Sequence, residues 1–128
     1  MDKEVIFTKK APNPVGPYSQ AVKAGDFLFV SGTIAIDPKT GKLVSGGLAK
    51  AVDQIMSNIK AVIGEVGADF KDIVKTTIFL TDMSKFPEVN EAYGKYFPQN
   101  PPARSTVEVS KLPVGVEVEI EAIVAIPR

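Results

Sequence analysis

Residues 47–82 read GLAKAVDQIMSNIKAVIGEVGADFKDIVKTTIFLTD, and their hydrophobic pattern changes period halfway along. In the first half, apolar residues recur at spacings of four and three, which predicts an amphipathic helix ending at Gly67. These residues are Leu48, Val52, Ile55, Ile59, Val62 and Val66. The second half, residues 72–82, is rich in β-branched residues and bounded by Asp, as is typical of a strand. The stretch therefore indicates a domain that combines helices with a sheet.

The flanking segments supply the remaining elements of this domain. Residues 5–9 predict a short strand, and residues 18–37 predict a hairpin that turns at the AGD sequence. Residues 84–97 predict a second helix with Ser84 as its N-cap. Two further strands are predicted, at 104–110 and 116–126. The order β-β-β-α-β-α-β-β predicts an α+β fold, in which two helices cover one face of a six-stranded mixed sheet.

The second face of this sheet has no predicted cover. Strand residues that alternate with the core positions are also apolar in several strands, for example in the run FLFV. An open sheet would leave these side chains as a large exposed apolar patch. We therefore expect a homo-oligomer that buries this face.

Length and composition favour one ordinary globular domain over residues 1–128. The chain is 45% hydrophobic and 23% charged, within the normal range for such domains. Its longest apolar runs have strand length, well short of the roughly 20 residues of a membrane helix. The start MDKEVIFTKK has no secretory h-region or cleavage site, so we expect a cytoplasmic protein without a membrane partner.

Charge and missing residue types limit the chemistry available. Fifteen basic residues balance fifteen acidic ones, and the lysines are scattered, so the basic footprint of a nucleic-acid partner is absent. The sequence contains no Cys and no His. This excludes disulfides, thiolate nucleophiles, Ser-His-Asp machinery and the usual zinc sites. Chemistry must come from carboxylates, Lys, Tyr, Arg, hydroxyls and backbone groups.

Arg104 is the one arginine inside the domain, because the other, Arg128, is the last residue. A lone arginine at a strand start is more often a member of a surface ion pair than a ligand anchor. The functional alternative is that the planar guanidinium of Arg104 binds a carboxylate with two parallel hydrogen bonds. The ammonium group of a lysine cannot form this pair of bonds. If strands 104–110 and 116–126 lie side by side, Arg104 can approach a carboxylate that orients a water. The candidates alternate with apolar residues and share one strand face: Glu117, Glu119 and Glu121.

Several sequence blocks together resemble the RidA (YjgF) family of imine deaminases. They occur in the family's order and are NPVGPYSQAV, LFVSGTIAIDPKTGKLV, VKTTIFLTDMSKFPEVNEAY, PARSTVEVSKLPVGVEVEI and EIEAIVAIP. The resemblance implies a chorismate-mutase-like domain in a homotrimer, with the sheets in a central barrel and clefts between subunits. It also implies hydrolysis of 2-imino acids or enamines, such as 2-iminobutanoate and 2-iminopropanoate, to 2-keto acids and ammonia, without cofactor or metal.

The resemblance also assigns roles to individual residues. It implies that Arg104 grips the substrate carboxylate and that Glu119 positions and activates the attacking water. It also places four residues with less specific roles in the pocket or its wall: Gly32, Phe86, Asn90 and Thr106. At the position of Thr106, many family members have Cys. Tyr18 and Ser31 match residues that line the same pocket. Without the family pattern, Tyr18 would be taken as a core-edge aromatic and Ser31 as an ordinary strand hydroxyl.

A second functional class fits the same residues. A non-catalytic regulatory trimer that binds a small carboxylate would need Arg104 but not Glu119. The presence of both residues favours the enzyme over the binding module.

Overall fold

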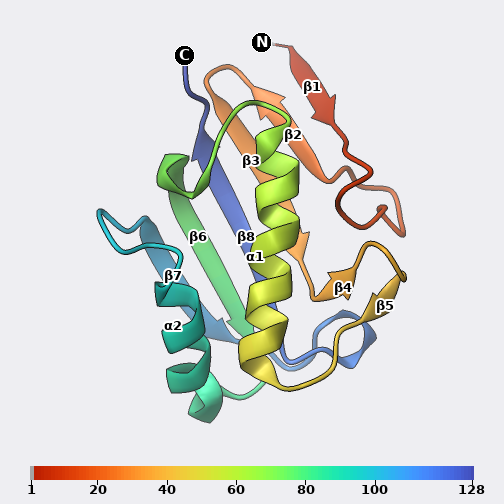
Figure 1. Cartoon of the computed structure of the whole chain (residues 1–128), viewed down its shortest axis with the longest axis vertical. Helices are drawn as coiled ribbons and strands as arrows, with labels where there is room; N and C mark the ends of the chain where they lie inside the picture. The colour runs from red at the N-terminus through yellow and green to blue at the C-terminus, as the bar shows by residue number, and fades with distance from the viewer. Residues whose placement is uncertain (1) are drawn as a thin grey trace.

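In the computed structural model, which describes residues 2–128, six strands form one mixed sheet in the order β1-β2-β3-β8-β6-β7 (Figure 1). Neighbouring strands are antiparallel, except that β6 and β7 are parallel. The strands are β1 (Lys3–Ile6), β2 (Ala21–Ala24), β3 (Phe27–Thr33), β6 (Ile73–Leu80), β7 (Ala103–Glu108) and β8 (Val118–Ala125). The predicted α+β fold with a six-stranded mixed sheet is confirmed.

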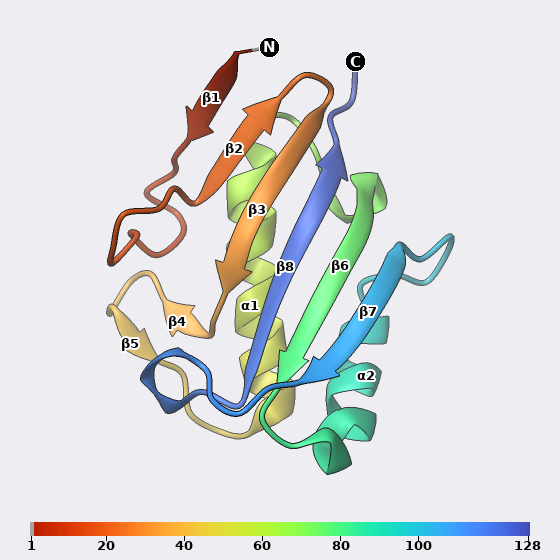
Figure 2. The same cartoon turned by 180° about the vertical axis from the view of Figure 1, so that it is seen from behind.

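Two α-helices, α1 (Leu48–Gly64) and α2 (Phe86–Gly94), cover one face of this sheet (Figure 1). The view from behind shows the opposite face without a helix on it (Figure 2). Residues 2–128 also contain three short 3-10 helices: η1 (Phe70–Asp72), η2 (Met83–Lys85) and η3 (Pro113–Gly115). Within residues 2–128, none of the helices combines the length and hydrophobicity needed to cross a membrane.

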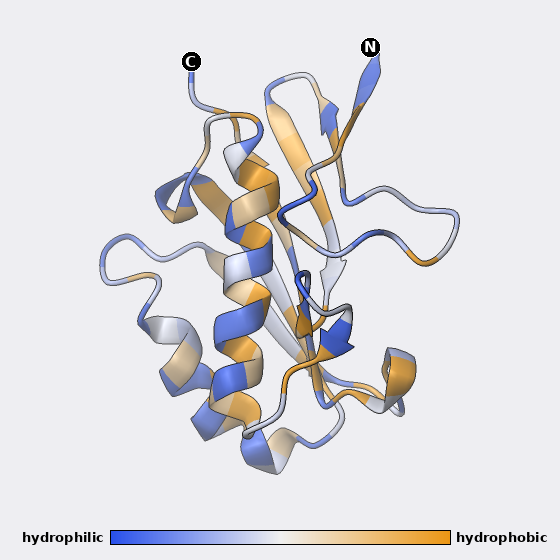
Figure 3. Ribbon diagram, turned by 45° about the vertical axis from the view of Figure 1, so that its right-hand side comes forward, coloured by the Kyte–Doolittle hydropathy of each residue, from blue (hydrophilic) through white to orange (hydrophobic). Residues whose placement is uncertain are grey.

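The apolar stripe of α1 packs against the sheet, and polar residues alternate with apolar ones along its length (Figure 3). Val52, Ile55 and Ile59 are fully buried there. Helix α1 ends at Gly64, and the turn that closes it reaches Gly67, the predicted C′ glycine, whose φ of 76° is one that residues other than glycine rarely adopt. The Gly67 N–H donates to the Gly64 carbonyl and the Ala68 N–H to the Ile63 carbonyl, each at 3.1 Å. This pair of bonds closes the helix as a Schellman motif.

The predicted 18–37 hairpin is shorter than expected. It consists of β2 and β3, and the chain then leaves the sheet and forms a separate small hairpin from β4 (Ile36–Asp37) and β5 (Lys42–Leu43). The cause is a buried amide on α1: Asn58 Nδ2 donates to the carbonyls of Ile34 at 3.4 Å and Ile36 at 2.8 Å. These bonds draw the chain toward α1 and away from the main sheet.

Two predicted element starts also differ. Ser84 is not an N-cap; Asp82 caps η2, because its Oδ1 accepts from the Ser84 N–H at 3.0 Å, and α2 begins only at Phe86. The first strand lies at Lys3–Ile6 rather than 5–9, since the Thr8 N–H donates to Gln20 Oε1 at 2.8 Å instead of joining the ladder.

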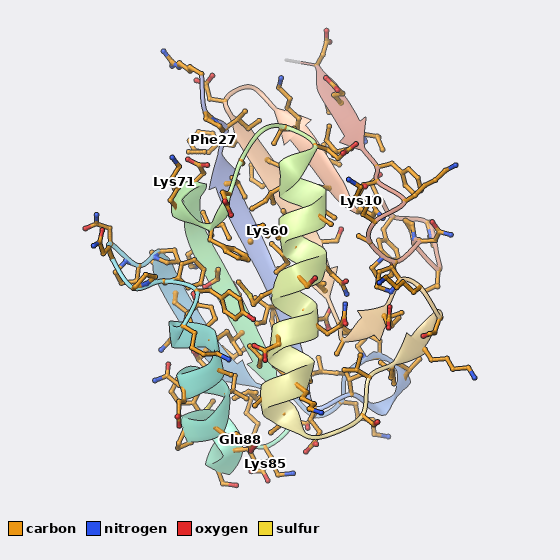
Figure 4. All side chains as sticks on the ribbon, viewed as in Figure 1. Lys10, Phe27, Lys60, Lys71, Lys85 and Glu88 are labelled. Carbon is orange, nitrogen blue, oxygen red and sulfur yellow. The ribbon has the colours of Figure 1, made fainter. Side chains whose placement is uncertain are left out.

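The uncovered face is rich in apolar side chains. Phe27 and Phe29 of β3 are 43% and 46% exposed, and Val107 of β7 is 38% exposed. Their neighbours Leu28 and Val30 point to the helix side and are buried. Figure 4 labels Phe27 at the end of β3 that lies near the C-terminus.

Candidate functional site

Arg104 lies on the edge strand β7 and is held by side chains of α2. Its Nη1 donates to Asn90 Oδ1 at 2.8 Å. Its guanidinium carbon is 5.2 Å from the ring centroids of both Phe86 and Tyr93. Two cation–π contacts and one hydrogen bond therefore fix the group, while no salt bridge to Arg104 is present among residues 2–128. The rest of the guanidinium fork remains available for a ligand.

The fold explains this arrangement. Arg104 pairs with Thr76 of β6, and Thr76 is buried under α2, so Arg104 lies on the helix side of the sheet. Phe86, Asn90 and Tyr93 are spaced by four and three along α2 and therefore share one side of that helix. Two of the three were predicted as site residues. Tyr93 was missed, although its spacing from Asn90 is the signal that could have found it.

Thr106, the residue predicted in place of the family's Cys, lies two positions further along β7. It pairs with Ile78, which is fully buried, so Thr106 lies on the same sheet side as Arg104. Its side chain is half-buried. The structure therefore brings together four of the predicted residues: Arg104, Phe86, Asn90 and Thr106.

Glu119 lies on β8, opposite Phe79 of β6. Its chain neighbours Val118 and Ile120 are buried on the helix side, so Glu119 faces the uncovered side of the sheet. Partial burial raises the pKa of the Glu119 carboxyl, and the negative charge of Glu121 raises it further. A carboxylate with a raised pKa is a stronger base toward a reacting water than an ordinary one.

Gly32 lies against this carboxyl. The pairing of β3 with β8 shifts between Val30 and Thr33, and this bulge brings Gly32 to the Glu119 side chain. A Cβ on residue 32 would overlap Glu119 Oε2. The missing side chain of glycine therefore leaves the space that the carboxylate occupies.

Ser31 adjoins Gly32 on β3, and Tyr18 lies in a loop that is bonded to this strand. Ser31 Oγ donates to the Ser19 carbonyl at 2.6 Å and so ties β3 to the loop that carries Tyr18. Tyr18 is 50% exposed, and its hydroxyl accepts from the Val15 N–H at 3.3 Å. Half of the Tyr18 surface is accessible, and its place in the pocket stays a prediction.

The two groups of residues do not meet within one chain. Strand β6 lies between β7 and β8, so the premise that the last two strands are neighbours is wrong. Two strand spacings separate the strands of Arg104 and Glu119, about 10 Å, and the two side chains lie on opposite faces. Strand β6 pairs in parallel with β7 on one side and antiparallel with β8 on the other, so it lies between them.

The three glutamates of the last strand are not equivalent. Glu117 precedes β8, and its carboxylate forms an ion pair with Lys85 Nζ. Figure 4 labels Lys85 near the start of α2. The prediction that all three share a strand face is therefore wrong for Glu117. Glu121 lies on the same strand side as Glu119 and is exposed. No group of three acidic side chains that could hold a metal ion occurs in residues 2–128.

A separate cavity lies away from these residues. It has a volume of about 570 Å³ and lies between the first loop and the β4–β5 hairpin. Phe7, Lys9, Asn13, Ile36 and Pro38 are among its lining residues. It contains none of the predicted site residues, and we assign the site from the side-chain geometry around Arg104 and Glu119 instead.

Comparison with known proteins gives the family. The family described as endoribonuclease L-PSP matches residues 8–126, nearly the whole chain. The chain belongs to this family. A RutC family protein of Pyrococcus horikoshii is 53% identical over 94% of this chain and 96% of its own. The human protein named 2-iminobutanoate/2-iminopropanoate deaminase is 46% identical over 94% of this chain and 88% of its own.

Solved structures of family members have the same fold. A Rid family protein of Yersinia pestis superposes with a TM-score of 0.93 and 48% identity, covering 97% of this chain and 99% of that one. The E. coli protein TdcF, solved with bound serine, gives a TM-score of 0.90 and 37% identity over 95% and 98% of the two chains. The resemblance to the RidA family seen in the sequence is therefore confirmed.

Proposed function

We propose that this protein hydrolyses 2-imino acids and their enamine tautomers to 2-keto acids and ammonia without a cofactor. The observation that carries the proposal is the fixed guanidinium of Arg104, held by Asn90 and two aromatic rings. Arginine binds a planar carboxylate with two parallel hydrogen bonds, and a prearranged fork loses little freedom when it does so. The substrate would thus be held by its carboxylate, with the imine carbon placed for attack.

The reaction needs one proton-transfer group, and Glu119 suits this role. The water oxygen bonds to the imine carbon while Glu119 takes a water proton and passes it to the nitrogen, which gives a carbinolamine. The hydroxyl proton then moves through Glu119 to the nitrogen as the carbon–nitrogen bond breaks. One water is consumed, and one 2-keto acid and one ammonia are released. An imine is already electrophilic, so a chain without histidine can supply the acid-base chemistry.

We further propose that each site forms between two subunits of a homotrimer. Arg104 and Glu119 lie on opposite faces of one sheet, so a single substrate can touch both only if a second copy supplies one of them. The exposed Phe27, Phe29 and Val107 supply an apolar surface on the Glu119 side for such a contact. Association through this face would bring β8 of one copy toward β7 of the next.

The names of relatives support the same reaction. The human relative and the chloroplast relative of Arabidopsis thaliana, named Reactive Intermediate Deaminase A, are 46% and 47% identical to this chain. The positions of Arg104 and Glu119 follow the family pattern recognised in the sequence. We therefore favour imine hydrolysis over the nuclease activity in the family's description, because this chain has balanced charge.

The direct test is hydrolysis of freshly generated 2-iminopropanoate by an Arg104→Ala variant. We expect at least a hundredfold loss of kcat/KM, because both binding and placement of the imine carbon are lost. Arg128→Ala is the matched control, since Arg128 is the other arginine and contacts the exposed Asp26. Wild-type rates of ammonia release by Arg104→Ala would overturn the proposal.

The alternative is a regulatory trimer that binds a small carboxylate without turning it over. The related protein TdcF was solved with bound serine, which supports a small amino-acid-like carboxylate as the ligand in this alternative. Calorimetric binding of 2-oxobutanoate together with no acceleration of imine hydrolysis would select this alternative.

A further inference from the structure

The ring of Tyr93 is fixed beneath Arg104 by contacts on several sides. Its hydroxyl lies 2.6 Å from Thr76 Oγ1, and its ring centroid is 4.8 Å from that of Phe97. Tyr93 is 4% exposed and Thr76 is 1% exposed, so water does not compete for this hydroxyl pair. The ring therefore has little freedom to turn away from the guanidinium that lies 5.2 Å from its centroid.

The hydroxyl pair connects both elements that position Arg104. Thr76 is the residue of β6 paired with Arg104 in the sheet, and Tyr93 belongs to α2. The bond therefore joins the strand next to Arg104 to the helix that covers it. Burial raises the pKa of the Tyr93 phenol, which keeps the hydroxyl protonated at neutral pH. A protonated phenol can serve as donor or acceptor to Thr76 and adds no charge beneath Arg104.

We propose that Tyr93, held by Thr76, is a positioning residue that sets the orientation of the Arg104 fork and thereby its affinity for a carboxylate. The inference rests on the proposed function, because it assumes that Arg104 binds the substrate carboxylate. Asn90 holds one end of the guanidinium through Nη1, and the Tyr93 and Phe86 rings restrict its plane. An arginine held in this way presents two parallel N–H groups, whereas a mobile one acts mainly as a diffuse charge.

Tyr93 is expected to act on binding more than on turnover. In a Tyr93→Leu variant the ring is lost, and we expect KM for 2-iminobutanoate and Kd for 2-oxobutanoate to rise together by about fivefold, the size of one cation–π contact. The value of kcat should change less, since Glu119 is not touched. Tyr93→Phe keeps the ring and should restore most of the affinity, and Thr76→Val should resemble Tyr93→Phe.

Tyr96→Phe is the matched control. Tyr96 lies just beyond α2, and its hydroxyl donates to Asp53 Oδ1 at 2.6 Å, the same length as the Tyr93–Thr76 bond. Within residues 2–128, Tyr96 makes neither a hydrogen bond nor a cation–π contact with Arg104. Loss of this hydroxyl should change the thermal midpoint of unfolding but leave KM and Kd unchanged.

A spectroscopic readout separates this inference from the proposed function. The chain has two arginines, so a ¹⁵N-labelled sample gives two Nε–Hε signals, and Arg104→Lys identifies the one from Arg104. We expect the Tyr93 part of the ring-current shift of the Arg104 signal to be lost in Tyr93→Leu, leaving the part from Phe86, and the full shift to be kept in Tyr93→Phe and Tyr96→Phe. This result holds even if imine hydrolysis is not the function. An unchanged Arg104 signal and wild-type Kd in folded Tyr93→Leu, or an equal effect of Tyr96→Phe, would overturn the inference.

Discussion

The Glu119 carboxyl occupies the space where a side chain on residue 32 would lie. A Cβ built on Gly32 would overlap Glu119 Oε2 and would lie 2.9 Å from Glu119 Cδ, closer than real Cβ atoms approach other heavy atoms. The two residues come from β3 and β8 and meet because of the bulge between Val30 and Thr33. The position of the proposed proton-transfer group thus depends on a glycine on the neighbouring strand.

Gly32→Ala is expected to lower kcat/KM at least tenfold by pushing the Glu119 carboxylate out of place, since small displacements of catalytic groups have effects of this order. Gly64→Ala is the control. A Cβ on Gly64 meets no atom within 4 Å, and alanine should stabilise the end of α1 by about 1 kcal/mol. Steady-state imine hydrolysis and urea unfolding check both variants. Full activity of Gly32→Ala would show that the carboxylate position is not critical.

Glu119→Gln is expected to lose about a hundredfold or more in kcat, because the amide cannot accept the water proton. Glu117→Gln should keep most of the activity, since Glu117 pairs with Lys85 outside β8. Glu121→Gln should also keep most of it. Equal losses in all three variants, measured as ammonia release, would contradict the choice of Glu119.

The pH dependence follows from the raised pKa of Glu119. The carboxyl must be ionised to accept a proton, so the rate should fall as pH falls through a pKa that lies above the ordinary 4.5. Glu121→Gln should move this acid limb to lower pH, because the charge of Glu121 contributes to the shift. A pH profile of kcat/KM for wild type and variant measures this. An unmoved limb would mean that another group controls it.

The raised pKa of Glu119 also affects the free energy of unfolding. Its contribution to stability decreases as pH rises, whereas the rate increases. Because the folded pKa of Glu119 lies above the unfolded one, the folded state binds the proton more tightly. This contribution to stability is present below the unfolded pKa and is lost as pH rises through the folded pKa. Glu119→Gln should therefore weaken the decline in the free energy of unfolding over that pH range. Urea titrations at several pH values check this, and an identical pH dependence in the variant would contradict it.

Val114 carries a backbone conformation that β-branched residues rarely adopt. Its φ is 50°, and its side chain is 73% exposed, so packing of this side chain offsets little of the backbone strain. The left-handed conformation costs about 1–2 kcal/mol for such a residue, whereas asparagine tolerates it. Val114→Asn should therefore raise the free energy of unfolding by about 1 kcal/mol. A urea midpoint that stays the same or falls would mean that Val114 makes contacts that offset the strain.

Local sequence patterns predicted the elements well. The spacing of Leu48, Val52 and Ile55 defined α1, and Gly67 marked its end, because helix periodicity and capping depend on neighbouring residues. The order of strands in the sheet depends on contacts between segments that are distant in the sequence. The placement of β6 between β7 and β8 could therefore not be predicted from local patterns. The separate β4–β5 hairpin was missed for the same reason, since Asn58 of α1 holds it.

The family pattern predicted which residues belong to the site. It did not predict how these residues are arranged in space. The sequence pattern placed Arg104 and Glu119 in one pocket, and the structure puts them on opposite sides of the sheet of one chain. The bulge that brings Gly32 to Glu119 has no local signal. Tyr93 was not predicted as a site residue. Its spacing from Asn90 places it on the same side of α2, but nothing in the local pattern indicates that this side contacts a guanidinium.

Subunit complementation tests the central claim, a hydrolytic site that needs Arg104 of one copy and Glu119 of another. Arg104→Ala and Glu119→Gln proteins, each inactive alone, are unfolded together in equal amounts, refolded and assayed with 2-iminopropanoate. A site between subunits is intact wherever the two unmutated residues meet, so random assembly should restore about a quarter of the wild-type activity. Activity of the mixture no higher than that of the separate variants would contradict the shared site.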